Sequence, residues 1–188
     1  MPTEETLLAT LTTNSKGEAT YTYTGSGNGI INLIAKYGES VQSSVYELID
    51  AIYYDPCTSD TSSNYYILTN VGNEISFTGN SLRYTVGTSN KTIGYDTNYS
   101  PITASDYLGK TVRFSVNVNP SNQCRLAIAQ LVNGSWRVVN SSYVSSQTTL
   151  TIDGEIDENA TRFAFRIDCN NGSSGDTVDF NNWTIYPI

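Results

Sequence analysis

Hydrophobic and polar residues alternate one by one along most of this chain. The clearest runs are A-T-Y-T-Y-T at residues 19–24, T-V-R-F-S-V-N-V at 111–118 and R-F-A-F-R-I-D at 162–168. Successive side chains of a β-strand point to opposite faces, so each run gathers its apolar side chains on one face. Turn-forming pairs such as Asn133-Gly134 and Asp153-Gly154 separate the runs. The pattern predicts an all-β chain that folds as an antiparallel β-sandwich or jelly roll.

A segment of loop composition divides the chain into two parts. It reads D-P-C-T-S-D-T-S-S-N at residues 55–64. We therefore expect two units, residues 1–53 and residues 54–188. The first unit holds only a few strand candidates, fewer than an ordinary sandwich needs. Because unpaired strand edges attract other strands, we expect it to belong to a longer chain or to make the protein a homo-oligomer.

The first unit carries a recognisable motif. L-T-T-N-S-K-G-E-A-T-Y-T-Y-T-G at residues 11–25 and I-I-N-L-I-A-K at residues 30–36 resemble the C-terminal half of a bacterial-type immunoglobulin-like repeat. Residues 41–49 resemble the closing strand of that repeat. The resemblance implies that residues 1–53 form a partial immunoglobulin-like β segment.

Three motifs of the second unit occur in the order found in jelly-roll carbohydrate-binding modules of the galactose-binding-like type. They are Y-L-G-K-T-V-R-F-S-V at residues 107–116, I-D-E-N-A-T-R-F-A-F at 156–165 and T-V-D-F-N-N-W-T-I at 177–185. The second unit resembles these modules over most of its length, which implies binding of a carbohydrate or cell-wall glycan. The two units together resemble adhesin-like surface proteins, or viral tail and fibre proteins, including those of methanogenic archaea. That resemblance implies an extracellular, cell-surface or virion-surface location.

Composition and charge exclude several classes of function. The chain has no histidine, so neither a Ser-His-Asp triad nor a Cys-His nucleophile can form, and imidazole ligands for zinc are absent. A net charge of -8 argues against binding to the nucleic-acid backbone. No apolar stretch approaches the roughly 20 residues of a membrane span, so we expect no membrane insertion.

Sugar binding uses exposed aromatic rings, on which the apolar C–H faces of sugars stack, among amide, carboxylate and guanidinium groups. Two segments have this composition, residues 94–99 and residues 134–137 with a tyrosine nearby. The alternative is that these aromatic residues pack inside the sandwich or in an oligomer contact. Trp183 lies in an alternating strand, and we expect it in the core. The candidate ligand-binding residues are Trp136, Arg137, Tyr143, Tyr95 and Tyr99.

Many modules of the resembled type hold a structural calcium ion between the start and the end of the domain. Calcium prefers six to eight oxygen ligands. The alternative reading is that the acidic residues at these two places are solvated loop side chains. The candidate Ca²⁺ ligands are Asp55, Asp60, Asp176 and Asp179.

The chain has three cysteines. Cys124 precedes one predicted strand and Cys169 follows another. If these strands pair antiparallel with residue 125 opposite residue 168, the two cysteines face each other and a disulfide can form. Cys57 would remain free. The alternative is that all three are buried free thiols.

These observations favour a non-catalytic binding or adhesion protein that recognises a carbohydrate or glycoconjugate. One alternative is a structural spacer, fibre or assembly module that makes only protein contacts. Another is a glycoside-active enzyme domain, since glycoside hydrolysis needs only two carboxylates. No segment resembles a glycosidase motif, so we expect no enzymatic activity.

Overall fold

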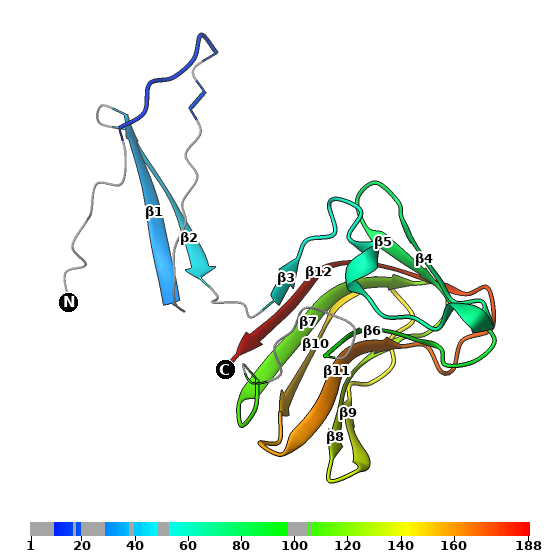
Figure 1. Cartoon of the computed structure of the whole chain (residues 1–188). Coiled ribbons are helices and arrows are strands. Elements are labelled where there is room, and N and C mark those ends of the chain that lie inside the picture. The colour runs from blue at the N-terminus through cyan, green and yellow to red at the C-terminus, as the bar shows by residue number, and fades with distance from the viewer. Residues whose placement is uncertain are drawn as a thin grey trace. The chain divides into compact units, whose positions relative to one another are not determined.

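The computed structural model describes residues 10–16, 18–19, 29–37, 40–48, 53–97, 105 and 107–188. The chain divides into two compact units, Met1–Ile49 and Asp50–Ile188 (Figure 1). Among the described residues there is no helix with the length and apolarity that a bilayer crossing demands.

The described part of the first unit is a two-stranded antiparallel sheet. Strand β1 (Gly29–Tyr37) pairs with β2 (Ser40–Leu48), in a register that sets Gly29 opposite Leu48 and Tyr37 opposite Ser40. These strands coincide with the segments that resemble an immunoglobulin-like repeat. The alternating run at residues 19–24 lies almost wholly outside the described residues. The immunoglobulin-like assignment stays a prediction.

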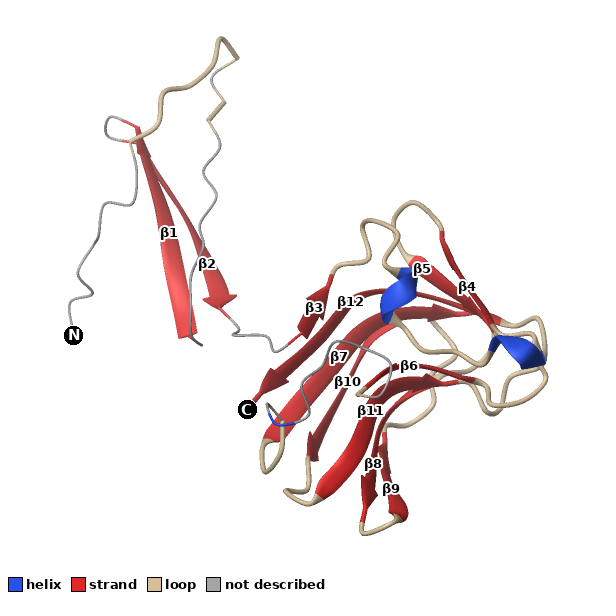
Figure 2. Ribbon diagram, in the orientation of Figure 1, coloured by secondary structure: helices blue, strands red, loops and turns tan. Residues whose placement is uncertain are grey.

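The second unit is a sandwich of two antiparallel sheets (Figure 2). A six-stranded sheet has the order β10-β7-β12-β5-β4, with β3 also paired to β12, and a four-stranded sheet has the order β6-β11-β8-β9. This architecture confirms the predicted all-β sandwich. The elements are β3 (Tyr53–Asp55), η1 (Ser62–Asn64), η2 (Thr69–Val71), β4 (Glu74–Phe77), β5 (Leu82–Thr85), β6 (Thr92–Asp96), β7 (Thr111–Pro120), β8 (Arg125–Val132), β9 (Ser135–Asn140), β10 (Thr148–Glu155), β11 (Ala160–Asp168) and β12 (Thr177–Pro187).

The predicted boundary after residue 53 lies inside β3. Tyr53 pairs with Ile185 and Asp55 with Trp183, so β3 adds to the β12 edge and belongs to the second unit.

Strand β12 contains a bulge that controls the core. Its pairing with β7 shifts between Asn181 and Thr184, and Asn182 has a positive φ of 52°. The extra residue resets the alternation of side chains. As a result Phe180 and Trp183, three residues apart, are both buried, with 1% and 0% exposure. The expected core position of Trp183 is confirmed.

The two sheets approach closely where β10 crosses β8. Gly154 lies within β10, and a Cβ atom there would come 2.9 Å from Cδ1 of Ile128. The turn predicted at Asp153-Gly154 is therefore wrong. The glycine serves close packing between the sheets rather than a change of chain direction.

The cysteine geometry confirms the predicted register but not the disulfide. Arg125 lies opposite Asp168, as expected, yet Cys124 and Cys169 are both free, buried thiols. Cys124 exchanges two hydrogen bonds with Val144, at 3.0 and 2.8 Å, whereas the Cys169 N–H donates to the Lys91 carbonyl at 2.8 Å.

Burial raises the pKa of Cys124 and the pKa of Cys57, each to about 12. It also raises the pKa of Cys169, which a charged Cys124 would raise further. Since the thiolate is the nucleophile, all three thiols react slowly with electrophiles in the folded protein. We expect slow reaction with Ellman's reagent in the native protein at pH 8, and three reactive thiols per chain in denaturant without reductant.

A sample reduced and desalted beforehand provides the control for this thiol count. A single reactive thiol in the unreduced, denatured protein, against three after reduction, would restore the Cys124–Cys169 disulfide.

Candidate functional site

The outward side chains of the four-stranded sheet form one continuous surface. Register places Asp96 of β6 opposite Ala164 of β11, and Ala164 opposite Ala129 of β8. We name this surface the tryptophan face and define it by Gly94, Asp96, Ala129, Trp136, Arg162, Ala164 and Arg166.

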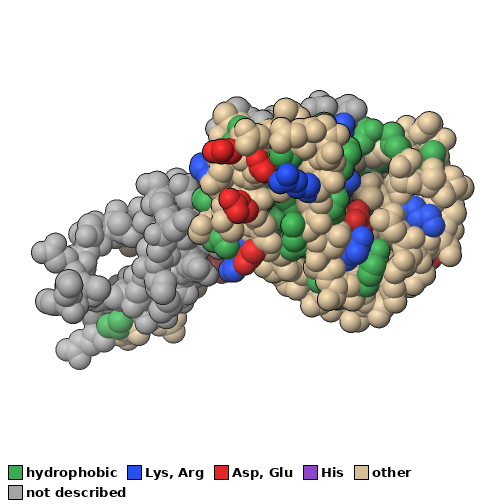
Figure 3. Space-filling model, turned by 90° about the horizontal axis from the view of Figure 1, so that it is seen from below, with side chains coloured by type: hydrophobic (Ala, Val, Ile, Leu, Met, Phe, Trp, Pro, Cys, Tyr) green, Lys and Arg blue, Asp and Glu red, His purple; other side chains and the backbone are tan. Residues whose placement is uncertain are grey.

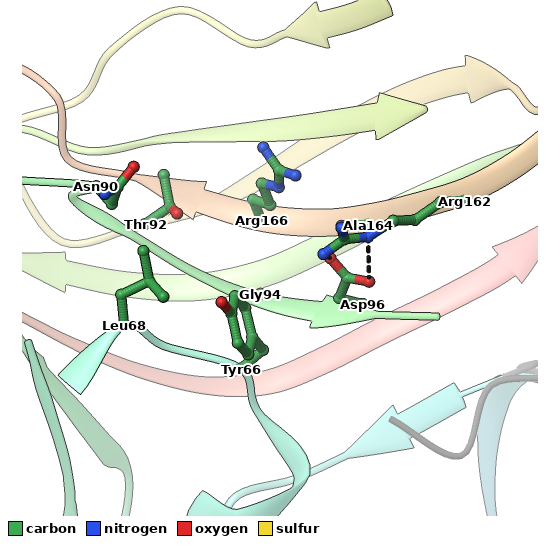
Figure 4. Close-up of a pocket in the computed structure, with 9 residues that line it drawn as sticks. All are labelled: Tyr66, Leu68, Asn90, Thr92, Gly94, Asp96, Arg162, Ala164 and Arg166. Atoms are coloured by element: carbon green, nitrogen blue, oxygen red, sulfur yellow. Dashed lines mark hydrogen bonds and ion pairs between the residues drawn. The ribbon is translucent and has the colours of Figure 1, made fainter. Parts of the chain in front are cut away.

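A cavity of about 140 Å³ lies at the β6 end of this face (Figure 4). Its far wall comes from the loop before η2. There Tyr66 exchanges two backbone hydrogen bonds with Gly94, at 2.7 and 3.1 Å, which fixes the loop against β6. Besides members of the tryptophan face, the cavity is lined by Tyr66, Leu68, Asn90 and Thr92.

The floor of the tryptophan face is made of small residues. Gly94 lies opposite Arg166 in the β6–β11 ladder. A Cβ atom at Gly94 would come 3.1 Å from Cγ of Arg166 and 3.1 Å from the carbonyl oxygen of Phe165. Glycine at this position therefore allows the Arg166 side chain to lie close to β6.

An ion pair forms one end of the cavity lining (Figure 4). Nε and Nη2 of Arg162 donate to the two carboxylate oxygens of Asp96, at 3.0 and 2.8 Å. The Asp96 side chain is only 3% exposed and that of Arg162 is 25% exposed. Such a two-bond pair holds both groups in fixed positions.

Arg166 lies beside this pair but forms no hydrogen bond or ion pair with Asp96. Among the described residues it has no hydrogen-bond or ion-pair partner, and Figure 4 shows no dashed line to it. Burial lowers the pKa of Arg166, and the nearby Arg162 lowers it further, while Asp168 and Asp96 act in the opposite direction. Its guanidinium is thus a partly desolvated cation with unused donors.

Trp136 forms the opposite wall of the face. It extends from β9, and the guanidinium carbons of Arg162 and Arg166 lie 5.5 and 5.2 Å from its ring centroid. Both arginines are on β11, so the indole reaches across β8, where Leu131 lies opposite both Trp136 and Arg162, and Ala127 lies opposite Arg166. The indole remains 46% exposed.

The far end of the same sheet face has a second charged group. Arg125 pairs with Asp168 at 3.7 Å, and its guanidinium carbon lies 4.7 Å from the ring centroid of Tyr143. Tyr143 is half-buried there. In the space-filling view, basic and acidic side chains are interspersed with hydrophobic ones, and no single charge dominates the visible surface (Figure 3).

The structure places the five predicted ligand-binding residues in different environments. Trp136 and Tyr143 lie against arginines of the four-stranded sheet's outer surface. Arg137 is next to Trp136 in sequence, but alternation turns it to the other face of β9, where it pairs with Asp157 at 2.9 Å. Tyr99 lies outside the described residues.

The prediction that Tyr95 binds a ligand is wrong, because this side chain lies inside the sandwich. It is 2% exposed and stacks on Tyr53, with ring centroids 3.8 Å apart. Burial raises the pKa of Tyr95 to about 12, with a further contribution from the charge of Asp55. The alternative of packing in the core holds for this tyrosine.

The four aspartates predicted to bind calcium each accept hydrogen bonds from the protein. Asp55 is buried and accepts from the Cys57 N–H at 2.7 Å and from the Tyr65 hydroxyl at 2.9 Å. The others accept from protein donors as well: Asp60 from the Ser62 N–H, Asp176 from the Ser173 N–H and Asn122, and Asp179 from Arg83.

No three His, Cys, Asp or Glu side chains of the described residues gather into a group that could hold a metal. The four aspartates therefore do not form a shared oxygen cage. Calcium binding stays a prediction without a ligand set in the described part of the chain.

Sequence reasoning missed Arg162, Arg166 and Asp96. The signal for the arginines was present in the alternating run at residues 162–168, where both occupy the polar face of one strand. Their closeness to Trp136 depends on strand order, which no local pattern encodes.

A second, more open groove of about 540 Å³ lies on the six-stranded sheet. Its floor is an amide ladder, in which Asn117 donates to Asn181 at 3.0 Å and accepts from Thr149 at 2.7 Å. The one aromatic residue in its lining, Phe180, is 1% exposed. This groove therefore offers no ring for a sugar to stack on.

No protein-family model matches the chain, and no curated protein matches its sequence. Solved structures do match it, among them three with a TM-score of 0.54 that cover 73% of this chain. One is the Clostridium thermocellum endo-1,4-β-D-xylanase 10B, with its CBM22-1 and GH10 modules and xylohexaose, at 13% identity. The chain spans only 28% of that structure.

The other two are single modules of which 94% is covered. They are the C-terminal family 22 carbohydrate-binding module of Clostridium thermocellum Xyn10B, at 12% identity, and a xylan-binding domain of the same module family, at 13% identity. These similarities establish the fold of the second unit as the jelly-roll sandwich found in carbohydrate-binding modules.

One buried amide supports the rim of the cavity. Asn73 is 1% exposed, and its Nδ2 group donates to the carbonyls of Leu68, Ser89 and Asn90 at 3.1–3.3 Å. Its Oδ1 atom accepts from the Tyr84 hydroxyl at 2.8 Å and from the Gly87 N–H at 2.7 Å. Leu68 and Asn90 line the cavity, so Asn73 joins two loops of the candidate site.

We expect Asn73→Ala to lower the free energy of unfolding by about 2–4 kcal/mol, because several buried groups lose their partner. Urea denaturation followed by tryptophan fluorescence measures the change. The control is Asn80→Ala in the exposed turn after β4, which should change stability by less than about 0.5 kcal/mol. Equal effects of the two substitutions would contradict the role of Asn73.

Proposed function

We propose that the second unit binds carbohydrate on the tryptophan face and performs no chemistry there. The observation that carries this proposal is the half-exposed Trp136 indole beside a fixed Asp96–Arg162 pair, on a sheet surface that includes Gly94 and Ala164. Pyranose C–H faces pack on aromatic rings, while pre-positioned polar groups bond the hydroxyls. In this site Asp96 accepts hydrogen bonds from hydroxyls and the guanidiniums donate to them.

The fold supports this assignment by analogy, since the similar solved structures are carbohydrate-binding modules. We place the binding at a cell surface or virion surface, with the chain acting as part of an adhesin or fibre. The acidic, tyrosine-rich composition fits such an exported surface protein.

The carboxylates of the four-stranded sheet are poorly suited to glycoside hydrolysis. Hydrolysis needs one carboxyl group as acid and a second as base or nucleophile. Asp96 is held by two hydrogen bonds from Arg162, and Asp168 is paired with Arg125. Because an arginine engages each carboxylate, binding is the better supported activity.

Glycan-array binding tests the proposal. We expect the full chain to bind at least one saccharide and Trp136→Ala to weaken that binding by at least about tenfold, or about 1.4 kcal/mol, because the stacking surface is lost. The side chain is half-exposed, so the variant should retain its far-ultraviolet circular dichroism spectrum.

Tyr54→Ala provides the matched control for this experiment. Tyr54 is an aromatic residue of similar exposure, 56%, on β3 of the six-stranded sheet. Its loss should leave saccharide binding unchanged. A blank array would favour a spacer or assembly module. If both variants bind as well as the parent, the tryptophan face is not the binding site.

We also propose that the first unit pairs with further strands from another copy or from a longer chain. Within its described residues β1 and β2 pair only with each other, and a lone two-stranded sheet is marginally stable. Sedimentation equilibrium of this chain should therefore give a mass of at least two copies. A monomer whose first unit resists proteolysis as well as the second would contradict self-association.

A further inference from the structure

The charged groups on the outer surface of the four-stranded sheet do not balance. Three arginines, Arg125, Arg162 and Arg166, lie there with two aspartates, Asp96 and Asp168. Asp96 forms an ion pair with Arg162 at 2.8 Å, and Asp168 forms one with Arg125 at 3.7 Å. One guanidinium, that of Arg166, remains without a carboxylate among the described residues.

This leftover cation contrasts with the rest of the chain, in which acidic residues outnumber basic ones by 18 to 10. The other described arginines that face solvent are paired. Arg83 bonds Asp179 at 2.6 Å, Arg113 bonds Asp153 at 2.7 Å, and Arg137 bonds Asp157 at 2.9 Å. An arginine with no carboxylate partner among the described residues, in so acidic a chain, is a specific feature of this site.

The position of Arg166 is also suited to a ligand. Its stem passes over Gly94, and its guanidinium carbon lies 5.2 Å from the Trp136 ring centroid. A sugar ring packed on the exposed part of the indole therefore places its substituents next to this guanidinium. Partial burial strengthens any hydrogen bond that the group makes to an anion, because less water competes for it.

We propose that the tryptophan face selects an acidic saccharide, a uronate or related sugar acid, whose carboxylate takes two hydrogen bonds from Arg166. The inference rests on the proposed carbohydrate-binding function. The planar guanidinium fork matches a planar carboxylate, which favours a sugar acid over a neutral sugar.

The neighbouring charges give the ligand one orientation. Asp96 repels a carboxylate and accepts hydrogen bonds from hydroxyl groups, so the hydroxyl-bearing edge of the sugar faces Asp96 and Arg162. The acid group faces Arg166 on the side of Trp136. Four ionisable groups lie close enough to affect the charge of the Arg166 guanidinium: Asp168, Asp96, Arg162 and Tyr66.

The experiment uses matched pairs of ligands. Oligosaccharides of galacturonate, glucuronate and mannuronate are titrated calorimetrically into the full chain, each beside its methyl ester, at about 0.15 M salt. We expect at least one free acid to bind tenfold or more tightly than its ester. Arg166→Gln should reduce the affinity for the acid about tenfold and remove the difference between acid and ester.

Arg83→Gln is the control, because it changes the net charge equally on the other sheet. It should preserve both the affinity and the preference for the acid. The thermal midpoint of each variant shows that the fold is retained, and Arg166→Lys, which keeps the charge but not the fork, should recover only part of the affinity.

The outcomes separate this inference from the proposed function. Binding of neutral saccharides that depends on Trp136, without preference for an acid, would overturn the acidic ligand and keep carbohydrate binding. Tighter binding of sulfated sugars than of the uronates would overturn the carboxylate class. If no saccharide binds, both the acidic ligand and the proposed function are overturned.

Discussion

The pairing of strand β12 is the constraint on which the second unit depends. One edge of β12 bonds β7 along nearly its whole length, while the other edge bonds β5 first and β3 afterwards. The bulge between Asn181 and Thr184 lies where the partner changes. It turns Trp183 inward, where the indole packs against Phe114 and Tyr65 at centroid distances of 4.8 and 4.9 Å. The aromatic core thus depends on one extra residue in one strand.

The tryptophan face depends on that core, because rigid strands position its side chains more accurately than loops would. Inward residues of β11, Phe163 and Phe165, are fully buried, which fixes the backbone from which the flanking outward arginines, Arg162 and Arg166, extend. Asp96 then holds Arg162 in one orientation, and Gly94 leaves space for Arg166. An ion pair with limited exposure, a guanidinium without a carboxylate partner in the described part of the chain, and an exposed ring are thereby arranged before any ligand arrives, which lowers the entropy lost on binding.

The local charge on the tryptophan face differs from the net charge of the chain. A net charge of -8 describes long-range repulsion from polyanions, which salt screens within roughly 8–10 Å. Recognition at contact distance depends on the few groups that meet the ligand. Arg166 is one such group, and the overall acidity of the chain hides it.

The sequence alone determined the all-β class and the buried side of the clearly alternating strands, such as β7 and β11, because these follow from alternation between neighbouring residues. It could not place Tyr95 or Trp136 correctly relative to each other, since both are aromatic residues near glycine and only burial distinguishes them. Tertiary structure decided which strands became neighbours, and so brought Trp136 of β9 across β8 to Arg162 and Arg166 of β11. It also left Cys124 and Cys169 as free, buried thiols. Such contacts join segments far apart in the chain, and their geometry depends on the packing of both sheets rather than on any local pattern.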